Sequence, residues 1–158
     1  MPVLSKHTNK LFGIDIHPFN EKVNKILLNY GIVTNLFQGS VSQMPFNNES
    51  FDLILSVSAF EFVEDKRNAC QEILRVLKKD GIFIIVTPGD SAFLDFGLRI
   101  LTKVSAKKDF GDNRQKVIPI IQEYFSISKT KLFPSLKFDF FIPVYKAYIL
   151  TPEKQKKH

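Results

Sequence analysis

The chain has 158 residues, of which 44% are apolar and 24% charged, the balance expected of one soluble globular domain. Its opening residues lack the pattern of a signal peptide, and no apolar run approaches the roughly 18 residues of a membrane span, so a cytoplasmic protein is expected. The one cysteine, Cys70, excludes an internal disulfide, and three scattered histidines give no metal-binding spacing, so no metal is expected.

The net charge of +6 is most concentrated at the C-terminus, where Lys154, Lys156 and Lys157 stand. This stretch has no apolar residues that could fix it to a core. Residues 152–158 are therefore predicted to be a basic, disordered tail, and residues 1–151 the domain. The other lysines form no stripe interleaved with aromatic residues, so nucleic acid is not the expected partner.

The first apolar run, residues 11–16, predicts a short buried strand that ends near Asp15. A helix is predicted to follow it, from about Asn20 to a stop at Gly31. Its apolar face is expected to carry Val23, Ile26, Leu27 and Tyr30, which have the i, i+3, i+4 and i+7 spacing of a helix.

The order of strand and helix then repeats along the chain. Further strands are predicted at residues 32–37, 51–57 and 82–86. Before the last of them, a helix is predicted from an N-cap at Asp65 to a stop at Asp80 and Gly81. A crossover that holds a helix returns the chain in the same direction, so this alternation predicts an α/β fold, with a parallel sheet and helices on its faces.

The pattern changes in the last third of the chain. The elements predicted there are a helical stretch at 93–104, a polar linker at 105–113, a short helix near Pro119, and strands at 125–133 and 140–150. The two strands are separated by a turn at Pro134 and Ser135, which favours an antiparallel pair at one edge of the sheet. Pro143 fits an edge strand or a bulge better than a sheet centre.

Ligands of open α/β sheets bind outside the carboxyl ends of the strands. The residues expected there are Asp15–His17, Gly39–Gln43, Ser56–Glu61 and Thr87–Asp90. An acidic residue that closes the second strand of a nucleotide-binding fold can accept hydrogen bonds from both ribose hydroxyls. Asp15 has this placement. Its position alone suits equally well a solvent-facing Asp before a helix.

Three segments carry a resemblance to a known family: GIDIHP at 13–18, GSVSQMPFNNESFDLILSVSAFEFVED at 39–65, and EILRVLKKDGIFIIVTPG at 72–89. In order and spacing they resemble the seven-stranded, class I S-adenosylmethionine (SAM)-dependent methyltransferases that modify small molecules, quinones and lipids. The resemblance spans about residues 10–150. It implies SAM as the cofactor and a Rossmann-like, doubly wound, mostly parallel sheet with a C-terminal antiparallel strand pair.

Other residues of the same pattern are interpreted as structural: Asp52, Glu72, Arg75 and Gly81. Among them, Gly81 is expected to supply a left-handed helix stop, and Glu72 with Arg75 an i, i+3 pair on a helix.

The resemblance also implies contacts with the adenosine part of the cofactor. Asp15 would bind the ribose, and Ile16 would lie against the adenine. Ser40 stands where the family usually has an acidic residue that accepts the adenine amine. Val41 would offer its backbone N–H to a ring nitrogen of the adenine.

The remaining contacts follow the strand at 51–57. Ser56 and Val57 would border the methionine part of SAM, and Glu61 is the one catalytic candidate, as an acidic neighbour of the acceptor or of the sulfonium. Phe62 stands where the family often has a histidine, so no histidine can transfer a proton there. The alternative interpretation makes Glu61 a carboxylate at a helix start and places Phe60 and Phe62 in the core.

The glycine-rich turn of the family has no counterpart in this sequence. No two of the seven glycines are closer than eight positions, so the chain holds no G-x-G. In the family this turn follows a first strand that lies between the second and fourth strands. The resemblance therefore implies an N-terminally truncated domain that lacks its central strand, to be completed by a missing N-terminal segment or by another chain.

Three functions are compared on these grounds. The first is transfer of the SAM methyl group to a small organic or lipid-like acceptor, and the apolar and basic residues 91–124 favour a hydrophobic one. The second is a catalytically inactive methyltransferase-like fragment that binds a partner protein. The third, a nucleotide-binding oxidoreductase, would need a glycine fingerprint that the chain lacks.

Overall fold

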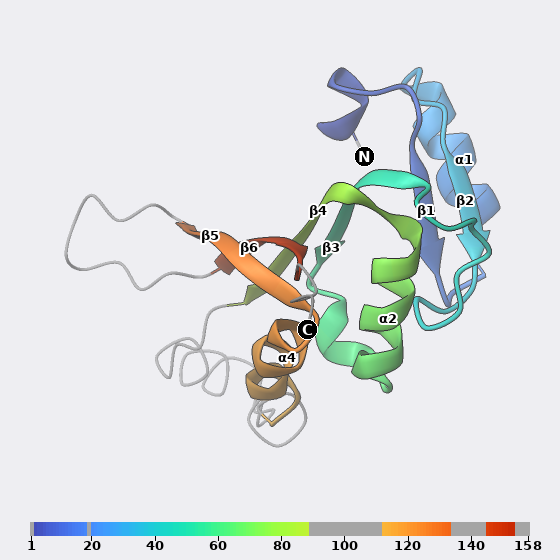
Figure 1. Ribbon diagram of the computed structural model, residues 1–158. Helices are drawn as coiled ribbons and strands as arrows, with labels where there is room; N and C mark the ends of the chain where they lie inside the picture. Colours follow the sequence, from blue (N-terminus) through green and yellow to red (C-terminus); the bar gives the residue numbers. More distant parts are fainter. Residues whose placement is uncertain (1, 19, 89–111, 134–144, 154–158) are drawn as a thin grey trace, which may run out of the picture. The chain divides into compact units, whose positions relative to one another are not determined.

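The computed structural model describes residues 2–18, 20–88, 112–133 and 145–153. The chain divides into two compact units, Met1–Pro45 and Phe46–His158, whose elements are labelled in Figure 1. Each unit has its own sheet, so the single sheet predicted from the sequence is divided in two.

The first unit contains a strand, a crossover helix and a second strand. Its elements are the 3-10 helix η1 (Leu4–Lys6), β1 (Phe12–Asp15), α1 (Asn20–Asn29) and β2 (Asn35–Gln38). The two strands pair in parallel, from Phe12 opposite Asn35 to Asp15 opposite Gln38. Leu11, Leu27 and Ile32 form the small core of this unit, with Leu4 packed against it.

The end of α1 follows the prediction, but most of its apolar face does not. Gly31 has a φ of +69°, the left-handed conformation that the predicted stop requires. Leu27 is buried, whereas Val23, Ile26 and Tyr30 are 40%, 49% and 76% exposed. Two strands of four residues each present too little surface to cover the whole apolar face of a helix.

The second unit is a four-stranded mixed sheet with helices packed on it. Its elements are β3 (Phe51–Val57), the 3-10 helix η2 (Phe60–Phe62), α2 (Lys66–Val76), β4 (Leu77–Pro88), α4 (Asp112–Gln122), β5 (Phe125–Phe133) and β6 (Tyr145–Pro152). The strand order is β3-β4-β6-β5, with β3 parallel to β4 and the other pairs antiparallel. The antiparallel pair at the sheet edge is thereby confirmed.

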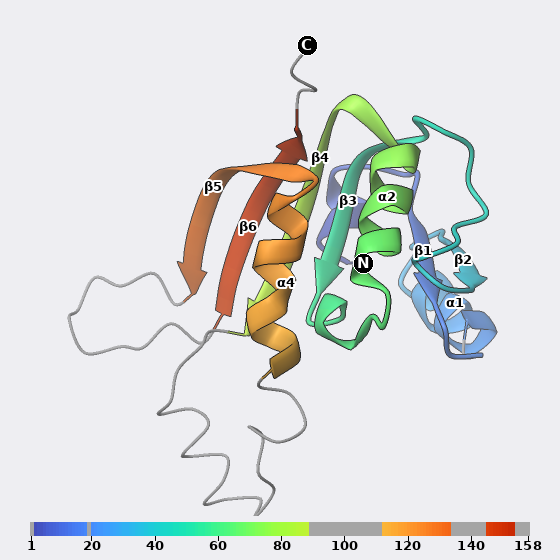
Figure 2. The same cartoon turned by 60° about the horizontal axis from the view of Figure 1, so that its bottom comes forward.

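Two helices lie side by side on one face of this sheet. Figure 2 shows α2 and α4 in front of the strands. The two helices contact each other, and α2 also contacts β4 while α4 contacts β5. The helix predicted at 93–104, the turn at Pro134 and Ser135, and Pro143 lie outside the described residues. The doubly wound arrangement predicts helices on both faces of the sheet. In the described part of the second unit, helices are seen on one face.

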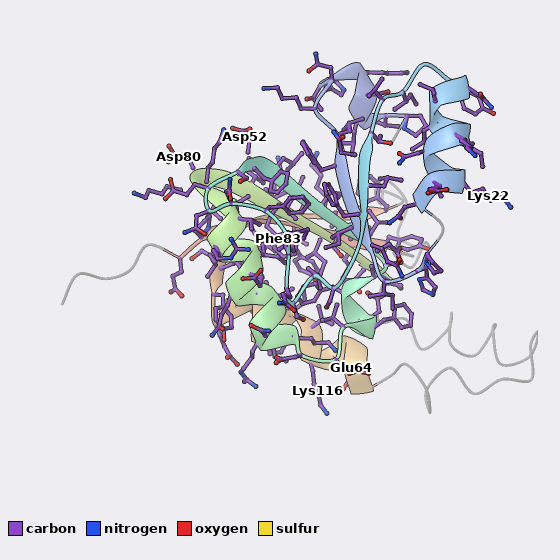
Figure 3. The ribbon with its side chains drawn as sticks, turned by 90° about the vertical axis from the view of Figure 1, so that its right-hand side faces the viewer. Lys22, Asp52, Glu64, Asp80, Phe83 and Lys116 are labelled. Carbon is purple, nitrogen blue, oxygen red and sulfur yellow. The ribbon has the colours of Figure 1, made fainter. Side chains whose placement is uncertain are left out.

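Alternate residues of β4 form the centre of the core under these helices. Phe83 and Ile85 are both 0% exposed, and the Phe83 ring centroid lies 5.4 Å from that of Phe125 and 6.1 Å from that of Phe60. In Figure 3 the labelled Phe83 lies within the unit, whereas Asp52 and Asp80 lie at its margin. Because β4 pairs with strands on both sides, it holds this core together.

Helix α2 begins as predicted. The Asp65 side chain accepts a hydrogen bond from the backbone N–H of Asn68 at 3.0 Å, which makes Asp65 the N-cap. The predicted pair of Glu72 and Arg75 is present, with N–O distances of 2.7 and 2.8 Å. Arg75 also donates to the Phe46 carbonyl at 2.7 Å, which fixes the loop before β3 to the helix.

The predicted end of this helix at Asp80 and Gly81 is wrong. The helix ends at Val76, and β4 begins at Leu77. The backbone N–H groups of Glu49 and Ser50 donate to the last helical carbonyls, those of Arg75 and Val76, at 2.9 and 2.7 Å. These bonds, which cross between distant segments, end the helix before the local glycine signal is reached.

Gly81 therefore has a structural role other than the predicted helix stop. It lies within β4 and is not among the residues with positive φ. A Cβ at this position would lie 2.7 Å from Leu77 Cδ1 and 2.9 Å from the Lys78 carbonyl oxygen. The position requires glycine because of close packing, since Leu77 is itself buried.

We predict that Gly81→Ala lowers the free energy of unfolding by about 1–3 kcal/mol, as is typical of overpacking against a buried side chain. Urea denaturation followed by circular dichroism would measure the change. Asp80→Ala is the matched control, because Asp80 is the exposed neighbour of Gly81 and its removal should be nearly neutral. Equal midpoints for the two variants would contradict the packing argument.

Cys70 gives a second prediction. Its side chain is buried, and burial, together with the charge of Glu123, raises the pKa of its thiol to about 12. We expect no reaction of the native chain with Ellman's reagent at pH 8, and release of one equivalent after unfolding. In the unfolded chain the thiol ionises at about pH 8.5, whereas in the native chain it stays protonated up to about pH 12. Ionisation therefore favours the unfolded state, and this group should lower the free energy of unfolding as pH rises between these values. Rapid labelling of the native chain by Ellman's reagent would contradict the predicted protection of the thiol.

Candidate cofactor site

The carboxyl end of β1 carries an exposed, hydrogen-bonded carboxylate. Asp15 Oδ1 accepts the backbone N–H of His17 at 2.9 Å and lies 2.8 Å from His17 Nδ1. The backbone N–H of His17, and next its ring, hold the pKa of Asp15 below its usual value. The Asp15 side chain is 63% exposed. An ionised acceptor therefore stands at the end of the strand, as the ribose assignment requires.

From the sequence, His17 was expected at this edge of the sheet, but no role was assigned to it there. The signal was the order Asp–Ile–His–Pro, because an Asp side chain commonly accepts the N–H of the residue two positions on. The His17 backbone N–H and ring both contact the same oxygen, Oδ1 of Asp15.

The loop after β2 lies beside Asp15. The Gly39 N–H donates to the Asp15 carbonyl at 2.9 Å, and Gln38 Nε2 donates to the Ile16 carbonyl at 3.3 Å. Ile16 is 67% exposed, and Ser40 is exposed as well. The structure thus brings together four of the predicted residues at the carboxyl edge of the first sheet: Asp15, Ile16, Ser40 and Val41.

The Ser40 hydroxyl has a local role. Its Oγ accepts the backbone N–H of Ser42 at 3.1 Å, and its carbonyl accepts the N–H of Gln43 at 3.0 Å. A hydroxyl oxygen has two lone pairs, so this bond leaves Ser40 able to accept one more hydrogen.

The other predicted residues lie at the carboxyl end of β3, in the second unit. Ser56 is paired with Ile85 and is half-buried, and Val57 is paired with Val86 and is 54% exposed. The next residue, Ser58, has a φ of +47°, which is uncommon for any residue but glycine. Such backbone strain is concentrated at functional sites.

Glu61 is the most unusual of the candidates. It lies in the middle of η2, is 3% exposed, and its Oε2 has no hydrogen-bond partner among the residues that the structure describes. Its place in the first turn of η2 agrees with the alternative interpretation, in which it is a carboxylate at a helix start. Of its two neighbours, Phe60 is in the core at 2% exposure and Phe62 is 61% exposed, so only one of the expected core rings is buried.

Metal and membrane features are not found in the described ranges. Within them, no group of three or more His, Cys, Asp or Glu side chains could hold a metal ion. No helix in that part of the chain is long and apolar enough to cross a membrane.

A family model described as a methyltransferase domain matches residues 1–85, more than half of the chain. The chain belongs to this methyltransferase family. Among curated relatives, the methyltransferase YcgJ of Bacillus subtilis, itself uncharacterized, is 43% identical over 49 residues, which cover 31% of the chain and 19% of YcgJ. The chain spans less than half the length of the curated relatives that it matches.

Solved structures show that the methyltransferase fold is shared. MMP1179 of Methanococcus maripaludis, provisionally described as SAM-dependent, has a TM-score of 0.68 at 21% identity, over 99% of this chain and 74% of that one. A structure from Haloferax volcanii holds the methyltransferase activator Trm112 in complex with a protein provisionally described as a methyltransferase. It matches with a TM-score of 0.67 at 13% identity, over 96% of this chain and 76% of the matched chain.

The contacts of His17 give a prediction for this methyltransferase domain. His17→Ala removes the ring contact but keeps the backbone N–H, which is the larger cause of the lowered pKa of Asp15. We expect the pKa of Asp15 to rise only part of the way toward 3.8, as measured by carboxyl-carbon NMR across an acid titration. His7→Ala serves as the control. A complete return to 3.8 in His17→Ala would show that the ring, and not the N–H, controls this carboxylate.

Proposed function

We propose that the chain is a SAM-dependent methyltransferase domain that acts on a small organic or lipid-like acceptor. The observation that carries this proposal is the ionised, exposed Asp15 at the carboxyl end of β1, with Ile16 exposed beside it. A carboxylate in this place suits the two hydroxyls of a ribose.

The surroundings of Asp15 fit the adenosine part of SAM. The exposed Ile16 side chain can cover one face of the adenine, and Ser40 can accept a hydrogen bond from the adenine amine. Val41 would offer its N–H to a ring nitrogen of the adenine. A serine lacks the carboxylate charge usual here in the family, so Ser40 should hold the adenine more weakly.

The residues that the resemblance assigns to the methionine part of SAM and to the acceptor belong to the second unit. Ser56 and Val57 end β3 where a ligand would lie, and Glu61 follows them on η2. SAM supplies a methyl group already activated on a sulfonium, so the main task of the protein is to hold the acceptor in line with the carbon–sulfur bond. Glu61 would be the acidic neighbour of that acceptor or of the sulfonium. The apolar and basic residues 91–124 favour a hydrophobic acceptor.

A methyltransferase-like module that binds a partner is the second candidate. Strand β3 ends its sheet, and Leu53, Leu55 and Val57 on it are 44%, 40% and 54% exposed. A terminal strand with apolar side chains can accept a further strand, supplied by a preceding segment or by another chain. The structural similarity to a methyltransferase that is bound to an activator gives this candidate some support.

Calorimetric titration with S-adenosylhomocysteine tests the first candidate. We predict saturable binding that Asp15→Ala weakens roughly ten- to hundredfold, because a hydrogen bond to a charged group contributes about 1.5–3 kcal/mol. The exposed Asp80→Ala is the control and should bind like the wild type. Flat heats at millimolar ligand would exclude cofactor binding by this chain and favour the partner-binding module.

A further inference from the structure

The burial of Glu61 has no explanation in packing alone. Its side chain is 3% exposed, and Oε2 finds no donor among the residues that the structure describes. A carboxylate oxygen can only accept, and leaving such a group unpaired away from water is strongly unfavourable. An apolar side chain of similar length would avoid this penalty. The unpaired oxygen of Glu61 is therefore best understood as an acceptor for a hydrogen-bond donor on a ligand.

The turn that carries Glu61 lies at the edge where ligands of α/β sheets bind. Strand β3 leads through the strained Ser58 directly into η2, and the Ser58 N–H donates to the Val86 carbonyl of β4 at 2.8 Å. This bond fixes the start of the turn to the carboxyl ends of β3 and β4. Ala59, which precedes η2, and Phe62, its last residue, are exposed, so the turn borders solvent.

Two lysines determine which kind of donor fits. Lys66, 7% exposed at the start of α2, donates to the Val63 carbonyl at 2.6 Å. Desolvation lowers the pKa of Lys66, the charge of Glu61 opposes this effect, and Lys116 on α4 adds to it. Figure 3 shows Lys116 at the same end of the unit as Glu64, which follows η2.

These charges disfavour an ionic ligand. A cationic group near Glu61 would meet the positive charge of Lys66, which interacts with the charge of Glu61. An anionic group would meet the unpaired oxygen of Glu61 itself. A neutral hydroxyl avoids both repulsions and supplies the one hydrogen that Oε2 lacks.

We propose that Glu61 Oε2 accepts a hydrogen bond from a neutral hydroxyl of the methyl acceptor, and that the domain therefore selects alcohols or phenols; this rests on the proposed function. If the methyl group goes to that oxygen, the oxygen–carbon bond forms as the carbon–sulfur bond breaks. The sulfonium becomes a neutral thioether, and the hydroxyl proton passes to Glu61 Oε2 and then to solvent.

Three small probes that share one ring test the choice of donor: benzyl alcohol, protonated benzylamine and benzoate. We expect ligand-observed NMR titrations at pH 7 to show the alcohol bound more tightly than the two ions. Glu61→Met should weaken alcohol binding about tenfold, in line with the loss of a hydrogen bond to a charged group. Glu64→Gln is the matched control, since Glu64 is an exposed carboxylate three residues away, and it should change nothing.

Thermal unfolding separates recognition from a structural role. Because Oε2 is unpaired in the free chain, Glu61→Met should leave Tm unchanged or raise it by roughly 2–4 °C. A lower Tm would make Glu61 a structural residue, satisfied by an internal water, and would overturn the proposal. Unchanged alcohol binding in Glu61→Met, preference for either ion, or absence of alcohol binding by the wild type would also overturn it.

The test is distinct from that of the cofactor site. A chain that binds S-adenosylhomocysteine but shows no alcohol binding dependent on Glu61 refutes this inference alone. A chain that binds the alcohol through Glu61 but gives flat heats with S-adenosylhomocysteine refutes the proposed function alone.

Discussion

The second unit depends on strand β4, which pairs on one side with β3 and on the other with β6. Phe83, near its middle, is completely buried, and its ring packs near those of both Phe60 and Phe125. Three elements distant in sequence are therefore held by one side chain: η2, β4 and β5. Because Phe60 belongs to η2, the same aromatic contacts that form the core also fix the turn that carries Glu61.

The two candidate carboxylates have opposite environments. Asp15 is exposed, hydrogen-bonded by His17 and held ionised, as suits a group that meets a polar ribose at the surface. Glu61 is buried, carries an unpaired oxygen and lies near the buried Lys66. In a dry environment a hydrogen bond is stronger and the selection of a donor is sharper. The environment of Asp15 suits the binding of one cofactor, and that of Glu61 suits discrimination among acceptors.

Sequence patterns predicted the elements whose causes are local. Strand 51–57, the cap at Asp65 and the glycine stop after α1 follow from short patterns and agree with the structure. The end of α2 could not be predicted in this way, because Glu49 and Ser50 end that helix from another part of the chain. The burial of Glu61 was missed for a similar reason. Its surroundings come from α4 as well as from β4, which no local pattern reveals.

The strand order also bears on the path by which the second unit folds. Strands β3 and β4 are joined through η2 and α2, so their parallel pairing closes a short loop, whereas β6 reaches β4 from the far end of the chain. Loop-closure entropy favours contacts that are close in sequence, so we expect the β3–α2–β4 segment to form early. Leu150 of β6 pairs opposite Phe83 and is itself buried. Pairing of β6 with β4 would then be a late step that completes the core and limits the folding rate.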